Sequence, residues 1–313
     1  MLSSQAHVVA RGSSGRRSRR RGAARLAGLG VGAAALLTLL AGCDIGKAFD
    51  GFGWPQGGIT RQSQRMYDLW IGSVVAALIV GFLVWGLIFW CIIRYRKRGA
   101  EMPAQTRYNM PLETLYSIAP FLIVAVLFYY TAIIQTDVNK VSKNPDVTVE
   151  VVAFKWNWQF NYRSGPTDPK AGQVGQTVAS TLGTSDVVPL LVLPTGRTIR
   201  FEEHAQDVIH SFWVPELLFK RDVFPGPARN VFQVTIDKEG RYVGRCAELC
   251  GAYHSMMNFE LVAVSPAEYD QFLAAKKAGA TTQEAMRAIG ESPVATTTRP
   301  FPTKPDASNF AGS

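Results

Sequence analysis

The chain has 313 residues, of which 47% are hydrophobic and 18% are charged, and its formal charge is +9. Residues 1–42 hold seven arginines and no acidic residue, so the remainder of the chain has a formal charge of only +2. The length allows two domains, and a basic charge confined to the start of the chain is no evidence for nucleic-acid binding, so we expect no nucleic-acid partner.

Residues 1–42 have the layout of a bacterial export signal. The stretch RRSRRRGAARLAGLGVGAAALLTLLAG runs from a basic cluster into a short apolar core, which is the order found in signal peptides. It ends in LLAGC, which resembles the lipobox of bacterial lipoproteins. We therefore expect cleavage before Cys43, lipidation of Cys43 and a short outer segment over residues 43–68. The alternative is an uncleaved anchor in which Cys43 is an incidental buried thiol.

Two long apolar runs predict a transmembrane helical hairpin over residues 69–135. Residues 69–93 carry no charge and would form a helix of ~37 Å, and the uncharged residues 115–134 also suffice for a ~30 Å hydrocarbon core. A buried hairpin of a soluble protein is the alternative, and runs of this length disfavour it. The short loop between the runs is basic, and the positive-inside rule places such a loop in the cytoplasm. Its basic residues are Arg94, Arg96, Lys97, Arg98 and Arg107.

Residues 136–264 predict an all-β outer domain, a small antiparallel sandwich or barrel. From residue 154 to residue 162 every second side chain is aromatic, which predicts one strand, beginning near Val147, with one buried face. Residues 163–186 are poor in large apolar side chains and predict a long surface loop. Turn-rich segments separate further short strands, which we expect over residues 190–193, 198–201, 230–236, 241–245 and 257–264.

The last part of the chain predicts a helix and a tail. Ser265 and Glu268 have the spacing of a capping box, and Pro266 suits the first turn of a helix. We therefore expect one C-terminal helix over residues 265–290. Residues 291–313 are rich in Pro, Thr and Ser, which predicts a disordered tail.

The segment GRCAELCGAYHSMMNF holds two of the four cysteines of the chain, Cys246 and Cys250. His254 and Met257 follow within seven residues, and His210 lies in the distant segment DVIHSFWVPE. Thiolate, imidazole and thioether together form the ligand set that copper prefers in electron-transfer sites. A disulfide between the two cysteines is the alternative outside the membrane. It would close a very tight loop and would not explain the histidines or the methionine.

Together with the hairpin, these segments resemble subunit II of haem–copper cytochrome c oxidases. CAELCGAYHSMM fits the C-x-E-x-C-x3-H-x2-M signature of that family, and DVIHSFWVPELLFKRDVFPGPARN is similar to the segment that carries its first histidine. The resemblance implies a cupredoxin-like domain with a binuclear copper centre. It assigns the copper ligands as two bridging thiolates, Cys246 and Cys250, one histidine for each copper, His210 and His254, the weak ligand Met257 and the backbone carbonyl of Glu248.

Three further roles are implied by the same resemblance. Trp156 in FKWNWQF would receive the electron from a c-type cytochrome, although it could instead simply pack in the sheet. The side chain of Glu248 would face subunit I and help to bind magnesium. Glu113 in PLETLYSIAP is similar to a glutamate at the cytoplasmic mouth of a proton pathway into subunit I. The alternative for Glu113 is a capping carboxylate near a helix start, where the helix dipole favours an acid.

The resemblance implies an oxidase subunit in the bacterial plasma membrane, with its copper domain on the outer face. It would pass electrons to subunit I, where oxygen is reduced to water with proton pumping, and would contact other oxidase subunits and the lipid bilayer. A quinol oxidase subunit would lack the copper ligands, and a nitrous oxide reductase would have a second metal domain and no hairpin. A membrane-anchored copper carrier or thiol redox protein would explain the cysteines but not the full ligand set.

The charge of the outer domain bears on the electron donor. Residues 138–264 contain 13 Lys and Arg and 13 Asp and Glu, so their net formal charge is zero. Family members that use a soluble basic cytochrome c usually present an acidic face, which steers the encounter. A patch around Glu202, Glu203 and Asp207 is the local exception that the sequence allows. We expect a membrane-attached c-type cytochrome within a cytochrome bc complex, in contact with the loop over residues 163–186, since a tethered donor gains effective concentration.

Overall fold

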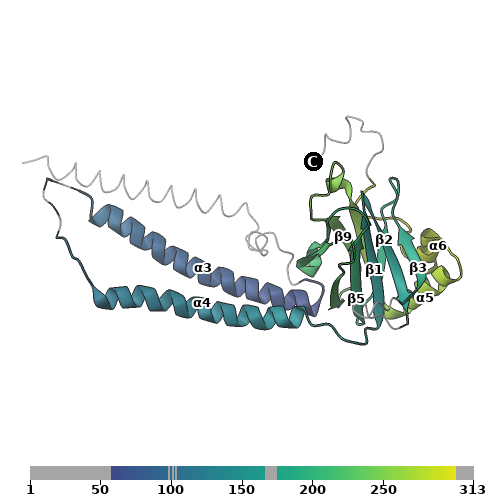
Figure 1. Ribbon diagram of the computed structural model, residues 1–313, viewed down its shortest axis with the longest axis horizontal. Coiled ribbons are helices and arrows are strands. Elements are labelled where there is room, and N and C mark those ends of the chain that lie inside the picture. Colours follow the sequence, from purple (N-terminus) through teal and green to yellow (C-terminus); the bar gives the residue numbers. More distant parts are fainter. Residues whose placement is uncertain (1–57, 98, 101, 103, 166–174, 301–313) are drawn as a thin grey trace, which may run out of the picture. The chain divides into compact units, whose positions relative to one another are not determined.

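The protein is described by a computed structural model in which two long helices precede a β domain (Figure 1). The predicted export signal and the lipidation site at Cys43 lie outside the described residues. The described residues are 58–97, 99–100, 102, 104–165 and 175–300.

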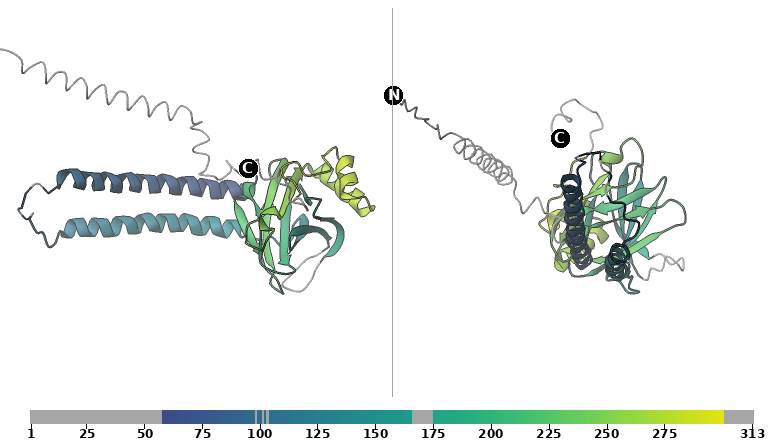
Figure 2. Two further views of the ribbon diagram at one scale, coloured as in Figure 1. Left: turned by 90° about the horizontal axis from the view of Figure 1, so that it is seen from above. Right: turned by 90° about the vertical axis from the view of Figure 1, so that its left-hand side faces the viewer.

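The helical hairpin is confirmed. Helix α3 (Arg61–Arg94) and helix α4 (Met110–Val138) run side by side (Figure 1, Figure 2), and an ion pair between Arg65 and Asp137 joins them. Both are long and apolar enough to cross a membrane, and their apolar side chains are exposed in the chain by itself. Helix α3 begins eight residues before the predicted run because Thr60 caps it by accepting the backbone N–H of Ser63.

The predicted β-sandwich is also confirmed, as two five-stranded sheets. The first sheet has the order β3-β2-β1-β5-β8 and the second the order β4-β10-β9-β6-β7. The strands are β1 (Val147–Phe154), β2 (Asn157–Ser164), β3 (Gln176–Leu182), β4 (Leu190–Pro194), β5 (Thr198–Ala205), β6 (His210–Val214), β7 (Phe219–Val223), β8 (Asn230–Thr235), β9 (Gly240–Cys246) and β10 (Asn258–Val264).

The single strand predicted to run from Val147 through the aromatic stretch is wrong. The chain reverses at Lys155 and Trp156, and β1 pairs with β2 as an antiparallel hairpin. Phe154 pairs with Asn157, and directly opposed residues share a face, so Phe154 does not lie on the face of Trp158. Aromatic residues continue at every second position through this two-residue turn, so the sequence pattern looks like that of a single strand.

The prediction of a purely antiparallel sandwich is wrong. Strand β1 pairs in parallel with β5, and β10 pairs in parallel with β4. The predicted surface loop over residues 163–186 is also shorter than expected. Its second part forms β3, which pairs with β2 although the sequence QTVASTL has no large aromatic side chain. Buried Ala179 and Thr181 supply the inner face of that strand, so small side chains conceal it in the sequence.

Stacked aromatic rings fill the space between the two sheets. Phe212 on β6 packs against Phe259 on β10 with a centroid distance of 4.9 Å, and Phe201 packs against Phe232 at 4.7 Å. All four are almost fully buried, and burying each such side chain stabilises the fold by about 1.5–3 kcal/mol. The contact between Phe212 and Phe259 holds β6 against β10, the strand that follows the cysteine-containing segment.

The single C-terminal helix predicted over residues 265–290 is two helices, α5 (Pro266–Lys277) and α6 (Thr282–Ala288). The capping box at Ser265 is present as predicted. Gly279 has a positive φ of 94°, a conformation that ends a helix readily because glycine has no Cβ. Thr281 then forms a second capping box with Glu284 and starts a new helix.

The first residues of the predicted disordered tail are held on the second sheet. Glu260 on β10 is fully buried and pairs with Arg241, whose Nε lies 2.7 Å from the carboxylate. The same carboxylate accepts the backbone N–H groups of Thr296, at 2.8 Å, and Thr297. Residues 301–313 of the predicted tail lie outside the described residues.

Glu203 is a buried carboxyl group on β5. Its side chain is 0% exposed, and neither carboxyl oxygen has a hydrogen-bond partner within the described part of the chain. Burial raises the pKa of Glu203 well above its ordinary value, against the opposing effect of Arg221 and with a further raising effect of Asp222. The folded protein therefore retains a proton that the unfolded chain releases above about pH 4.3.

We expect Glu203→Gln to stabilise the protein at neutral pH. A carboxyl group whose pKa is raised by folding makes the free energy of unfolding fall as the pH rises above its unfolded pKa. Glutamine, which cannot ionise, removes this loss, so the stability of the variant relative to the parent should rise from pH 4 to pH 7, by at most about 1.4 kcal/mol for each pH unit above the unfolded pKa. Denaturant unfolding of the detergent-solubilised chain at a series of pH values measures this difference. The exposed Glu239→Gln is the control, and parallel pH profiles for Glu203→Gln and the parent would contradict the prediction.

Candidate metal centre

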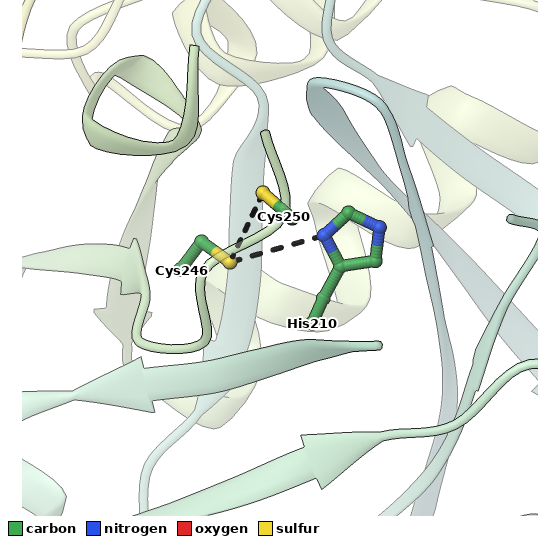
Figure 3. A group of neighbouring side chains, drawn as sticks. All are labelled: His210, Cys246 and Cys250. Carbon is green, nitrogen blue, oxygen red and sulfur yellow. Dashed lines mark hydrogen bonds between the residues drawn. The ribbon is translucent and has the colours of Figure 1, made fainter. Parts of the chain in front are cut away.

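Two β-strands and the connection after one of them supply the predicted ligands. His210 is the first residue of β6, and Cys246 is the last residue of β9. Cys250, His254 and Met257 lie in the connection to β10, where a short 3-10 helix, η4 (His254–Met256), gives the chain its bend. Figure 3 shows the two thiols and the His210 imidazole pointing toward one another.

The centre of the site is the pair of thiols. The Sγ atoms of Cys246 and Cys250 are 3.8 Å apart, and His210 Nδ1 lies 3.8 Å from the Cys246 sulfur (Figure 3). The ligand atoms of these three buried residues all lie within 4.8 Å of one another, and no other such His, Cys, Asp or Glu group occurs in the described residues. The backbone carbonyl of Glu248 lies 3.3 Å from the Cys246 sulfur.

The other two predicted ligands lie on the Cys250 side. His254 Nδ1 is 3.6 Å and Met257 Sδ is 3.8 Å from the Cys250 sulfur. Met257 is buried and His254 is half-buried. The other four predicted ligands are thus divided equally between the two sulfurs, with one histidine at each thiol.

These separations suit a soft metal ion between the side chains and do not suit a disulfide. A disulfide has an S–S distance of ~2.05 Å, and both cysteines are free. Two thiolates at ~2.3 Å from one tetrahedral ion would lie ~3.8 Å apart, and a thiolate and an imidazole nitrogen at ~2.0 Å would lie ~3.5 Å apart. The measured values of 3.6–3.8 Å agree with this spacing. The donor set of thiolate, imidazole and thioether fits copper.

The two thiols differ in acidity. Burial opposes ionisation of Cys246, but hydrogen bonding with His210 and with neighbouring backbone groups lowers the pKa of Cys246 to about 7. Burial and the nearby charge of Cys246 raise the pKa of Cys250 to about 12. A metal ligand must be a thiolate. Cys246 therefore ionises more readily than Cys250, and both must lose their protons when a metal binds.

His210 is oriented by a carboxylate that sequence reasoning did not single out as a site residue. Its Nε2 lies 2.8 Å from Asp207 Oδ1, and a proton shared in this contact leaves Nδ1 facing the thiols as a lone pair. Burial tends to lower the pKa of His210, but its contacts with Cys246 and Asp207 raise it overall. The spacing D-V-I-H contains the pair, but a carboxylate three residues from a histidine is too common to be a signal.

Trp156 contacts the cysteine-containing segment directly. Its indole N–H donates to the backbone carbonyl of Cys250 at 3.3 Å, and its ring lies 4.9 Å from the Tyr253 ring in an edge-on arrangement. Gly251 has a φ of +125°, and a Cβ at this position would lie only 3.1 Å from the indole. Glycine therefore permits the close packing of the indole against the loop. Trp156 is half-buried, so part of its ring reaches the surface.

The two predicted carboxylate sites lie away from the thiols. The Glu248 side chain is 45% exposed, with Lys220 Nζ 3.9 Å from its carboxylate. Glu113 lies in the first turn of α4 and accepts the backbone N–H of Asn109 at 3.0 Å. This contact is the capping role that was the alternative for Glu113.

The acidic surface patch that the sequence allowed is wrong. Glu202 is 4% exposed and Glu203 is 0% exposed, because both lie in the middle of the first sheet. Only Asp207 reaches solvent, with 31% of its side chain exposed. Adjacent glutamates in a strand point to opposite faces, and here each face is covered.

Comparisons with known proteins show which family the chain is similar to. Residues 147–264 match the family described as cytochrome C oxidase subunit II, periplasmic domain. The chain is similar to the probable cytochrome c oxidase subunit 2 of Nocardia farcinica, at 46% identity over 89% of this chain and 88% of that protein. It is 41% identical to cytochrome c oxidase subunit 2 of Mycobacterium tuberculosis, over 86% and 87% of the two chains. Among solved structures, the periplasmic domain of subunit II of cytochrome oxidase of Bradyrhizobium japonicum aligns with 44% of this chain and 96% of that chain, at 26% identity and a TM-score of 0.36.

Proposed function

The chain belongs to the cytochrome c oxidase subunit II family, and we propose that it is the electron-receiving subunit of a haem–copper oxidase. It accepts electrons from a c-type cytochrome at its outer domain and passes them to subunit I, where oxygen is reduced to water with proton pumping. The observation that carries this proposal is the arrangement of two free thiols 3.8 Å apart with one histidine beside each.

The residues that would hold a binuclear copper centre are the two cysteines, the two histidines, Met257 and the Glu248 carbonyl. When bound, copper would supply reversible one-electron redox chemistry at these residues, and a rigid ligand set would keep the rearrangement on electron transfer small. The chain itself supplies a dry, rigid setting: Cys246, Cys250 and His210 are buried, and the aromatic core fixes the strands that carry them. Trp156 supplies the route from the surface, since its indole contacts the Cys250 carbonyl.

Copper loading of the purified full-length chain in detergent tests the metal assignment. A purple, mixed-valence chromophore with two coppers per chain is the expected result, and Cys91→Ser, which changes a free cysteine of α3, should leave it unchanged. A colourless chain that binds no copper and forms a Cys246–Cys250 disulfide would reject the assignment. That result would favour the thiol redox protein, and a single weakly held copper would favour the copper carrier.

We further assign the chain to the bacterial plasma membrane, with the basic loop in the cytoplasm and the domain over residues 136–264 outside. The orientation is supported by the basic residues between the two helices. Residues 1–42 would be removed and Cys43 lipidated. Mass spectrometry of the purified chain tests this assignment, because an intact N-terminus through residue 42 would refute it.

Two carboxylates would serve the interface with subunit I. The exposed carboxylate of Glu248 would contribute one oxygen ligand to a magnesium ion, which prefers oxygen ligands. Within the described residues, Glu248 does not belong to any group of three possible metal ligands. Subunit I would therefore supply the further ligands. Glu113 would lie at the cytoplasmic mouth of a proton pathway. Magnesium content of the purified oxidase after Glu248→Gln tests the first role, and proton uptake after Glu113→Gln tests the second.

The donor is proposed to be a membrane-attached c-type cytochrome within a cytochrome bc complex. The outer domain has no net charge, and the buried positions of Glu202 and Glu203 remove most of the possible acidic patch. Steered association with a soluble cytochrome would therefore be weak. The segment over residues 163–186 directly follows β2, so it is the candidate contact with this partner.

Respiration of native membranes should change little with salt if the donor is tethered. A steered bimolecular reaction weakens as the Debye length shortens from ~10 Å at 0.1 M salt. Oxygen consumption measured at increasing ionic strength therefore distinguishes the two cases. A steep fall that added soluble basic cytochrome c restores would exclude the tethered donor.

A further inference from the structure

One carboxylate connects the His210 imidazole to the turn that carries Trp156. Asp207 Oδ1 lies 2.8 Å from His210 Nε2 and also accepts the backbone N–H of Val208 at 2.7 Å. Its second oxygen, Oδ2, accepts the backbone N–H of Lys155 at 2.7 Å. Lys155 is 52 residues earlier in the chain, so the contact joins the β1–β2 turn to the start of β6.

The contact with His210 determines which imidazole nitrogen faces the thiols. His210 is fully buried, so no bulk water is available to replace the carboxylate as the partner of Nε2. A carboxylate at Nε2 holds the proton there and leaves Nδ1, 3.8 Å from the Cys246 sulfur, free to bind a metal. Carboxylates in this position also make an imidazole a stronger ligand.

The contact with Lys155 fixes the β1–β2 turn that carries Trp156. Lys155 immediately precedes Trp156, and the indole of Trp156 donates to the Cys250 carbonyl and packs on Gly251. The turn is therefore held at its backbone by Asp207 and at its side chain by the cysteine-containing segment. The same aspartate thus fixes the ligand His210 and the surface tryptophan with respect to each other.

We propose that Asp207 is a positioning residue that fixes the electron-receiving Trp156 and the copper ligand His210 at a constant position relative to each other. The inference deepens the proposed function and rests on it for the copper ligands, but the two backbone contacts are independent of copper. This positioning role differs from attraction of the c-type cytochrome, in which the partly exposed carboxylate of Asp207 would interact with the cytochrome and not with its own chain.

The test compares Asp207→Asn and Asp207→Ala with the parent. Asparagine keeps one oxygen, which can still accept the Lys155 N–H, but its NH2 group cannot accept from Val208 or His210, whereas alanine removes all three contacts. Asp237→Asn is the control, because this exposed aspartate lies in the β8–β9 turn and its loss changes the net charge equally. Asp207→Asn also serves as the folded comparison if alanine destabilises the domain.

The first measurement needs no copper. Hydrogen exchange of the metal-free full-length chain should be at least tenfold faster at the Lys155 amide in Asp207→Ala, since an exposed amide exchanges without the opening that a bonded amide requires. Asp207→Asn and Asp237→Asn should stay near the parent. Unchanged exchange at Lys155 in Asp207→Ala would overturn the inference, whatever the outcome for copper.

The second measurement uses the assembled, copper-loaded oxidase. Asp207→Asn should shift the visible absorption of the copper centre and weaken copper retention against a chelator by about 10–100-fold. Its kcat should fall while KM for the reduced c-type cytochrome changes less than about twofold, because the donor surface is intact. The inference would be overturned if the copper spectrum and copper retention of Asp207→Asn were unchanged and its KM exceeded the parental KM only at low salt. That result would assign Asp207 to attraction of the electron donor. A parent chain that binds no copper would contradict the proposed function, and the exchange measurement would still decide the contact with the turn.

Discussion

Replacing Cys246 with serine is expected to abolish oxidation of the c-type cytochrome while leaving the chain inserted in the membrane. The Cys246 sulfur is the central contact of the site, within 3.8 Å of His210 Nδ1, the Cys250 sulfur and the Glu248 carbonyl. A serine hydroxyl remains protonated and is a poor ligand for copper, which prefers thiolates. Oxygen consumption with a reduced c-type cytochrome measures the loss, and the amount of subunit in the membrane measures insertion.

Two further variants make the Cys246→Ser result specific. Cys91→Ser changes the other described free cysteine, which is exposed on α3 and far from the ligands in sequence, and should retain full activity. His210→Ala should reproduce the loss, because it removes a ligand from a different strand. Full turnover by purified Cys246→Ser that contains no copper would be incompatible with the proposed site.

Replacing Trp156 with leucine is expected to lower kcat on the order of 10²-fold, the size of effect that a misplacement of about 1 Å can have on a reacting pair. The indole lies between the surface and the Cys250 carbonyl. Leucine has neither an aromatic ring nor a hydrogen-bond donor to place there. The copper spectrum should be unchanged, because no proposed ligand is altered. Stopped-flow reduction of the copper centre by the donor measures the step itself.

Trp156→Phe separates the two contributions of the indole. Phenylalanine keeps a ring against Gly251 and Tyr253 but loses the N–H that donates to Cys250. Its rate should therefore lie between those of the parent and of Trp156→Leu. If the leucine variant accepts electrons at the parental rate, Trp156 merely packs against the loop and another residue receives the electron.

The sequence carries strong signals for the hairpin and for the ligand types. Uncharged runs of 20 residues or more have few structural uses outside a membrane. Cys246, Cys250, His254 and Met257 lie within one short segment, so their proximity could be predicted. The sequence offers His210 as a candidate ligand, but 36 residues separate it from Cys246, so local spacing could not show that the two residues meet, and the family resemblance assigned its role.

Other features could not be predicted because their causes are not local. Asp207 contacts Lys155 across 52 residues, and nothing near either residue signals the other. Glu203 looks like a surface glutamate in EEHAQD, and only the second sheet makes it buried. The division between α5 and α6 was different, since Thr281 and Glu284 have visible capping-box spacing and Gly279 precedes them. The start of α6 is therefore visible in the sequence.

The contact between Glu260 and the last described residues has a consequence for biosynthesis. Glu260 lies on β10, and its backbone partners at Thr296 and Thr297 are made 36 and 37 residues later. While the ribosome is still adding those residues, the carboxylate has Arg241 but lacks the N–H groups that complete its shell. Strand β10 is therefore fully stabilised only after residues 296 and 297 have been synthesised. A chain truncated before Thr296 would keep the pair between Glu260 and Arg241 but would leave the buried carboxylate without two N–H partners, so its β domain should unfold at a lower denaturant concentration.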